Sequence, residues 1–144
     1  MSAAGLVLIG ELGLRAIRRA RWDAELVGGL TMGADPVAFA IARASQEAPP
    51  VVDAFSVRKE AKAHGAGRRI EGNFRPGARV VVVEDVITTG QSALTAVEAV
   101  REAGGSVSGV LAVVDRDEGG RAAIERAGVP VLPLVGVSDL GVSR

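Results

Sequence analysis

Two adjacent carboxylates and a turn rich in hydroxyl groups are the residues of this chain best suited to chemistry. Glu84 and Asp85 follow four consecutive valines. The residues that come next lead into a helical pattern: Val86, Ile87, Thr88, Thr89, Gly90, Gln91 and Ser92. Free N–H groups and the positive dipole end at the start of a helix favour a phosphate. The carboxylates suit sugar hydroxyls or a metal ion, and a mere cap would need one acid, not two.

The elements that must position these residues follow from the periodicity of the chain. We expect helices at residues 4–21, 34–48, 91–103 and 120–127, and strands at 24–27, 51–57, 79–84, 107–114 and 129–135. Strands that alternate with helices predict an α/β fold, with a mostly parallel central sheet flanked by helices. Ligands of such sheets lie beyond the carboxyl ends of the strands. Four segments should therefore meet at one edge: residues 28–35, 58–69, the turn after Asp85, and 115–117.

The composition favours one domain over residues 1–144, with 48% hydrophobic residues. Lys plus Arg equals Asp plus Glu at 17 each, which gives no support to a nucleic-acid partner. The absence of cysteine excludes disulfides, thiolate metal sites and a cysteine nucleophile. No signal peptide or membrane-spanning run is recognisable, so we expect a cytoplasmic protein with no membrane partner.

Two loops on the predicted ligand edge could bind anions. The first contains Gly28, Gly29 and Gly33, which would let backbone N–H groups face an anion, although an ordinary tight turn is the alternative. The second gathers basic residues and the only histidine: Arg58, Lys59, Lys62, His64, Arg68 and Arg69. Such a loop suits a departing pyrophosphate. A solvated surface would show the same charge pattern.

Together these segments resemble the orotate phosphoribosyltransferases, which have the type I phosphoribosyltransferase fold. The resemblance rests on RVVVVEDVITTGQS, GGLTMGADP, FSVRKEAKAHGAGRRIEG and the Asp-Arg-Asp at 115–117, and it extends over about residues 6–141. It implies transfer of phosphoribosyl from phosphoribosyl diphosphate to orotate, giving orotidine 5′-phosphate and pyrophosphate in pyrimidine biosynthesis. It also implies a homodimer with shared active sites.

The resemblance implies a role for each site residue. Arg58, Lys59, Lys62 and His64 would contact the diphosphate, with Lys59 reaching into the neighbouring subunit. Backbone N–H groups of residues 88–92 would hold the 5′-phosphate, and Glu84 and Asp85 the ribose hydroxyls. Orotate would bind to Thr88 and Arg116. Lys59, Lys62, His64 and Asp85 would be catalytic. Mg²⁺ would bind mainly through the substrate, with no direct protein ligand.

The resemblance does not include the N-terminal segment of the family. Family members carry a few dozen residues ahead of the first helix, including a loop that packs against the orotate ring. We therefore expect a truncated N-terminus or the loss of part of the base site. Two alternatives stay open: a phosphoribosyltransferase for another base, and a non-catalytic regulator that binds nucleotides or RNA. The intact basic loop argues against a regulator, whereas the missing segment argues for one.

Overall fold

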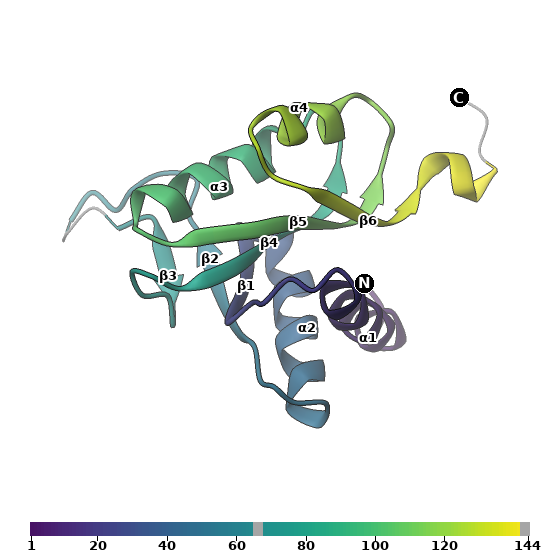
Figure 1. The fold of residues 1–144 in the computed structure, drawn as a ribbon, viewed down its shortest axis with the longest axis horizontal. Helices are drawn as coiled ribbons and strands as arrows, with labels where there is room; N and C mark the ends of the chain where they lie inside the picture. Colours follow the sequence, from purple (N-terminus) through teal and green to yellow (C-terminus); the bar gives the residue numbers. More distant parts are fainter. Residues whose placement is uncertain (65–67, 142–144) are drawn as a thin grey trace.

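A computed structural model describes residues 1–64 and 68–141 of the chain. Helices and strands alternate along most of it (Figure 1). The elements in chain order are α1 Ala3–Arg19, β1 Leu26–Leu30, α2 Ala34–Glu47, β2 Asp53–Val57, β3 Ile70–Gly72, β4 Arg79–Ile87, α3 Gln91–Glu102, β5 Ser106–Asp115, α4 Gly120–Arg126, β6 Val131–Gly136 and the short 3₁₀ helix η1 Val137–Leu140.

The six strands form one sheet in the order β3-β2-β1-β4-β5-β6. All neighbours pair in parallel except β3, which is antiparallel to β2. The mostly parallel sheet expected from the sequence is therefore present. Strand β4 pairs with β1 on one side and with β5 on the other. Its valine run at 80–83 is fully buried, as expected for a central strand.

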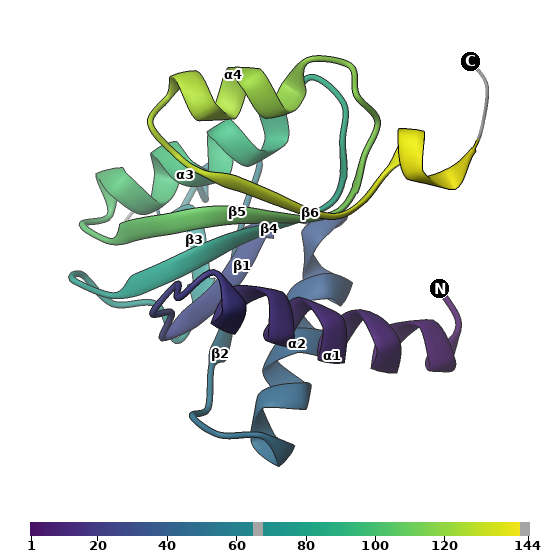
Figure 2. The same ribbon diagram turned by 45° about the vertical axis from the view of Figure 1, so that its right-hand side comes forward.

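Two helical layers cover the sheet. Helices α1 and α2 pack on one face, and α3 and α4 on the other (Figures 1 and 2). Alternate valines of β4 serve the two layers: Val81 and Val83 belong to the cluster under α1 and α2, whereas Val80 and Val82 belong to the cluster under α3. The central strand is thus fixed from both faces up to the point where Glu84 begins.

The structure differs from the sequence expectation at three strands. Strand β1 includes Gly28 and Gly29, which we expected in a loop. A Cβ atom at either position would lie 2.2 Å from a carbonyl oxygen, that of Phe55 or Val83, so only glycine fits between the neighbouring strands. Strand β4 continues to Ile87, beyond the expected end at residue 84. The short strand β3 was not expected.

No described helix is long and apolar enough to cross a membrane.

Candidate substrate site at the carboxyl edge of the sheet

Four segments meet where the parallel strands end, as expected. Residues 31–33 follow β1, the basic loop at 58–69 follows β2, residues 88–90 follow β4, and residues 116–117 follow β5. Backbone hydrogen bonds join these segments in pairs. The Thr31 N–H donates to the Val57 carbonyl at 2.8 Å, and the Arg116 N–H donates to the Ile87 carbonyl at 3.0 Å.

The two adjacent acids have different surroundings. Glu84 follows Val80 and Val82 on the α3 face and is only 6% exposed. Burial, and to a lesser degree the charge of Asp85, raises the pKa of Glu84 to about 7. Asp85 is exposed and accepts a hydrogen bond from the Val86 N–H at 2.8 Å. Near neutral pH the pair therefore combines one open carboxylate with one carboxyl group that can hold a proton.

The Asp85 carboxylate also lies against the segment that follows β1. A Cβ atom added to Gly33 would lie 2.9 Å from Oδ1 of Asp85. The absence of a side chain at Gly33 thus leaves room for the carboxylate at this corner of the site, and any larger residue there would displace it.

The turn after β4 is packed against the start of α4. Gly90 adopts a left-handed conformation, with φ of 83°, just before α3 begins at Gln91. A Cβ atom at Gly120 would lie 2.4 Å from the Thr88 carbonyl oxygen and 2.7 Å from the Gly90 nitrogen. The Thr89 hydroxyl accepts a hydrogen bond from the Gln91 N–H at 3.4 Å. These contacts direct the N-terminus of α3 towards the carboxyl edge, where an anion could bind.

The basic loop is closed at its root and exposed beyond it. Arg58 and Arg69 are joined by a backbone hydrogen bond of 2.7 Å, and the Arg69 guanidinium donates to the carbonyls of Arg58 and Lys59. Lys62 and Arg58 pair with Glu71 of β3, at 2.7 and 3.4 Å. The hydrogen bond and charge of Lys62 are the main reason that the pKa of Glu71 is lowered.

The two remaining candidate residues of this loop, Lys59 and His64, are exposed. Among the described residues, Lys59 and His64 form no ion pair. Residues 65–67, which belong to the same loop, lie outside the described part of the chain. The structure thus brings the root of the loop to the carboxyl edge beside residues 31–33.

Arg116 projects from a turn that its neighbours hold in place. The buried Asp115 carboxylate accepts a hydrogen bond from the Asp117 N–H at 3.0 Å. The Arg116 side chain is 54% exposed and pairs with Glu118 at 3.0 Å. The guanidinium therefore lies half-exposed at this edge, with the Glu118 carboxylate as one of its partners.

Asp35 lies in the expected segment 28–35 at this edge, but the sequence analysis gave it no role of its own. Its carboxylate accepts hydrogen bonds from the hydroxyls of Thr31, at 2.6 Å, and Ser56, at 2.8 Å. The spacing of Thr31 and Asp35 is a local signal that could have been noticed. The contact with Ser56 joins residues 21 positions apart and depends on β1 and β2 being neighbours.

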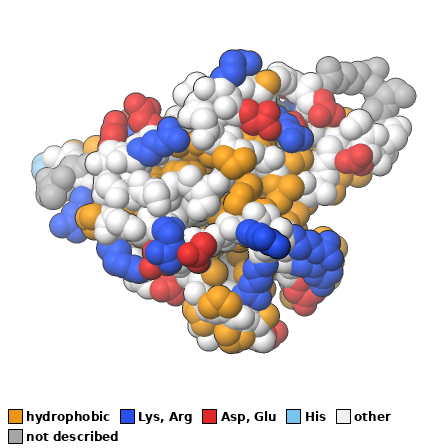
Figure 3. All heavy atoms as spheres, viewed as in Figure 1, with side chains coloured by type: hydrophobic (Ala, Val, Ile, Leu, Met, Phe, Trp, Pro, Cys, Tyr) orange, Lys and Arg blue, Asp and Glu red, His pale blue; other side chains and the backbone are white. Residues whose placement is uncertain are grey.

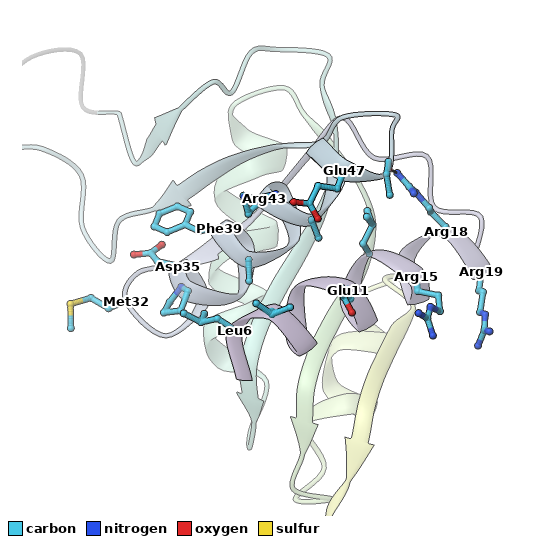
Figure 4. Close-up of a pocket in the computed structure, with 16 residues that line it drawn as sticks. Leu6, Glu11, Arg15, Arg18, Arg19, Met32, Asp35, Phe39, Arg43 and Glu47 are labelled. Carbon is cyan, nitrogen blue, oxygen red and sulfur yellow. Dashed lines mark hydrogen bonds and ion pairs between the residues drawn. The ribbon is translucent and has the colours of Figure 1, made fainter. Parts of the chain in front are cut away.

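A groove lies between α1 and α2 and reaches this edge at one end. Basic side chains gather over α1 (Figure 3). The groove has a volume of about 1210 Å³ and places Leu6 of α1 opposite Phe39 of α2, with Met32 at one end and Arg19 at the other (Figure 4). Among its lining residues, Met32 and Asp35 link it to the substrate site.

Acidic residues do not form a metal cage in the described part of the chain. No group of three or more His, Asp or Glu side chains is close enough together to hold a metal ion.

The chain is similar to several curated orotate phosphoribosyltransferases. No family model matches it. It is 56% identical over 121 residues to the orotate phosphoribosyltransferase of Mycobacterium avium, covering 84% of this chain and 66% of that protein. It is 52% identical over 136 residues to the enzyme of that name from Aquifex aeolicus, covering 94% and 73%. The chain therefore spans about two thirds to three quarters of these relatives' length.

A solved structure agrees with these matches. The orotate phosphoribosyltransferase of Mycobacterium tuberculosis H37Rv, in complex with inorganic phosphate, superposes with a TM-score of 0.88 at 48% identity, covering 99% of this chain and 76% of that one. The same protein has also been solved in complex with 5-phospho-α-D-ribosyl 1-diphosphate, and that structure superposes with a TM-score of 0.81 at 47% identity, covering 95% and 76%.

Proposed function

The chain belongs to the orotate phosphoribosyltransferase family, and on this premise we propose that it transfers phosphoribosyl from phosphoribosyl diphosphate to orotate. The products would be orotidine 5′-phosphate and pyrophosphate, in pyrimidine biosynthesis. The family and the type I phosphoribosyltransferase fold, both expected from the sequence, are confirmed. One observation supports the proposal for this chain: a turn at a helix N-terminus, an exposed acidic residue and the root of a basic loop meet at one sheet edge.

The turn after β4 suits the phosphoribosyl group. Backbone N–H groups of residues 88–92 would hold the 5′-phosphate, since the N-terminus of α3 opens at this point. Asp85 would accept hydrogen bonds from ribose hydroxyls and place a negative charge near the cation-like ribose of the transition state. Glu84, with its raised pKa, could also donate a hydrogen bond from its protonated carboxyl group to a ribose oxygen near neutral pH.

The basic loop suits the leaving group. Pyrophosphate departs with several negative charges, and cations at Arg58, Lys59, Lys62 and His64 would stabilise them. Lys62 would exchange its present partner, Glu71, for a diphosphate oxygen. No covalent nucleophile is required.

Mg²⁺ fits the donors at this edge. The ion usually binds through one or two carboxylates and substrate phosphates while it keeps several waters. The exposed Asp85 would supply such a carboxylate, and the substrate would supply most of the other ligands. When bound, the ion would neutralise charge on the diphosphate.

The base would lie between the turn and residue 116. Arg116 would exchange Glu118 for the orotate carboxylate, and Thr88 would hydrogen-bond the ring. The two alternatives, another base or a non-catalytic regulator, have no support among the relatives described above. The cytoplasmic location stays a prediction.

Turnover of orotate with and without Asp85 tests the proposal. The wild-type chain with Mg²⁺ should convert orotate and phosphoribosyl diphosphate into orotidine 5′-phosphate. Asp85→Asn should lower turnover by about a hundredfold, of the order seen when one preorganised interaction is lost. Asp23→Asn, an exposed carboxylate at the opposite end of the sheet, is the control. Equal turnover in both variants would remove Asp85 from the site.

We also propose a homodimer in which Lys59 serves the neighbouring subunit. Exposed apolar side chains along the groove between α1 and α2 support an interface there: Val7 of α1, Phe39 of α2, and Met32 at the end of the groove. Lys59 forms no ion pair within the described chain, so it is available to a partner's substrate.

Mixing two inactive variants tests the shared site. Lys59→Ala and Asp85→Asn chains that exchange subunits would place both lesions in one site of each heterodimer and leave the other site intact. About half the dimers would be heterodimers, so about a quarter of wild-type activity should return. No recovery after verified exchange would show that Lys59 acts within its own subunit.

A further inference from the structure

Asp35 connects two segments of the substrate edge through its carboxylate. It lies in the first turn of α2 and is half-buried. Its Oδ2 accepts the Thr31 hydroxyl at 2.6 Å, and its Oδ1 accepts the Ser56 hydroxyl at 2.8 Å. The Thr31 distance is typical of a charge-assisted hydrogen bond to a carboxylate, and the Ser56 distance is typical of an ordinary O–H···O hydrogen bond.

The two hydroxyls belong to the roots of two different loops. Thr31 begins the segment after β1, and its N–H donates to Val57 at 2.8 Å. Ser56 is the residue before Val57, where β2 ends and the basic loop begins. Asp35 itself donates its N–H to the Met32 carbonyl at 3.2 Å. One side chain therefore joins α2, residues 31–33 and the start of the basic loop.

The direction of these hydrogen bonds limits what the hydroxyls can do. A hydroxyl has a single O–H donor. Thr31 and Ser56 both donate to Asp35, so neither can donate to a phosphate while that arrangement lasts. Asp35 is also negatively charged and would repel a diphosphate. The cluster is therefore better suited to holding the loops than to contacting the anion.

We propose that Asp35 is a positioning residue for the diphosphate half of phosphoribosyl diphosphate. By holding Thr31 and Ser56, it fixes the segment at 31–33 against the end of β2. The backbone of that segment and the cations after Val57 then face the same pyrophosphate. This inference rests on the proposed function. It concerns the binding of one substrate and leaves the orotate side, near Arg116, unaffected.

A simpler role would be stabilisation of α2, since an acid in the first turn suits the helix dipole. The two roles differ in what happens when a hydroxyl is removed. Thr31→Val and Ser56→Ala keep the carboxylate and its charge at the helix start. They should leave α2 intact and still release one of the two loops.

The experiment combines calorimetric binding of phosphoribosyl diphosphate, in the presence of Mg²⁺, with the KM for orotate. Asp35→Ala should weaken diphosphate binding by about tenfold, the equivalent of one charge-assisted hydrogen bond. Thr31→Val and Ser56→Ala should each weaken it by roughly threefold, as for a single weaker bond. The double variant Asp35→Ala/Ser56→Ala should bind no more weakly than Asp35→Ala alone.

Two further variants serve as controls. Ser56→Thr keeps the hydroxyl and should retain wild-type affinity. Asp53→Asn removes an exposed carboxylate from the amino end of the same strand, where it accepts a hydrogen bond from Asn73. This variant should change neither the affinity for phosphoribosyl diphosphate nor the KM for orotate. The KM for orotate should stay within about twofold of wild type in every variant, a change equivalent to a few tenths of a kcal/mol.

Unchanged affinity in both Thr31→Val and Ser56→Ala would overturn the positioning role, whatever Asp35→Ala does. These two variants also decide the matter if Asp35→Ala does not fold. Additive losses in the double variant would show that Asp35 does not act through Ser56. A wild-type chain that fails to bind phosphoribosyl diphosphate would contradict the proposed function itself, which is a different result from wild-type binding with unaffected variants.

Discussion

The turn after β4 and the basic loop after β2 lie at the same edge of the sheet but are held by different forces. The turn at residues 88–90 follows the buried Ile87 and packs on Gly120 and Ile124 with no space to spare. The described residues of the loop from 58 to 64 are all exposed. Hydrogen bonds from Arg69 and ion pairs with Glu71 are what hold them.

This difference matches the tasks that we propose for the two segments. A phosphate that stays in place through the reaction is best met by a site whose geometry is fixed before it binds. A pyrophosphate that must leave is better met by cations whose present partners can be exchanged. Exposed ion pairs add little stability, so the loop can change partners at low cost. Four predictions test this contrast, from the largest expected effect to the smallest.

Gly120→Ala should disrupt the turn after β4, which is the fixed segment of the comparison. The new Cβ would overlap the Thr88 carbonyl oxygen and the Gly90 nitrogen. Overpacking of this kind costs about 1–3 kcal/mol, and backbone atoms cannot rotate away, so we expect about 3 kcal/mol in urea unfolding. Binding of phosphoribosyl diphosphate should be lost as well.

Gly119→Ala is the matched control for that variant. A Cβ at Gly119 meets nothing within 4 Å, but the residue has a φ of 90°. It should therefore cost only the backbone strain, about 1–2 kcal/mol. Equal losses of stability in the two variants would mean that the contact between the turn and α4 does not hold the turn.

Glu84→Gln should change how stability depends on pH. The pKa of Glu84 rises from 4.5 to about 7 in the folded protein, so the folded state binds this proton more tightly than the unfolded chain does. Stability from this group is complete below pH 4.5 and is lost as the pH rises through 7, by about 3 kcal/mol. The glutamine variant lacks that loss.

Urea unfolding at pH 4.5 and pH 8.5 measures the effect. The wild type should lose stability relative to Glu84→Gln between these two values. Glu98→Gln, which changes an exposed glutamate of α3, should follow the wild type. A parallel response of wild type and Glu84→Gln would show that folding does not raise the pKa of Glu84, and the contrast between Glu84 and Asp85 would disappear.

The sequence predicted the elements around the turn after β4 better than those around the basic loop after β2. The valine run and the helix pattern after Gln91 are local signals, and both elements are present. Strand β3 has three residues and exists only through pairing with β2, so its own sequence carries little signal. The glycines at 28 and 29 predicted a loop because their reason for being glycine lies in neighbouring strands. The same holds for Asp35, whose partner Ser56 is distant in sequence.

Arg116→Ala probes a residue that shares features of both segments. Its backbone N–H donates to the Ile87 carbonyl at the fixed turn, whereas its half-exposed side chain pairs with Glu118. Loss of a charge-assisted pair with orotate should cost roughly 1.5–3 kcal/mol, seen as a raised KM for orotate with little change for phosphoribosyl diphosphate. Arg121→Ala, which removes a similar pair on α4, is the control. Equal effects on both substrates would make Arg116 structural, or the base something other than orotate.

Glu71→Gln should have the smallest effect of the four variants, and it acts on the basic loop after β2. It removes the negative charge that pairs with Lys62 and Arg58, and it leaves the shape of the side chain unchanged. The midpoint of unfolding should stay at the wild-type value, because both pairs are exposed. Since Glu71 competes with the diphosphate for Lys62, phosphoribosyl diphosphate should bind more tightly by a small factor, less than about fivefold. The gain should shrink at high salt, as screening weakens the competing pair.

Glu125→Gln, which breaks a pair of similar length on α4, should leave binding unchanged. Weaker binding by Glu71→Gln would mean that Glu71 holds Lys62 in its working position, and the basic loop would then be as preorganised as the turn after β4.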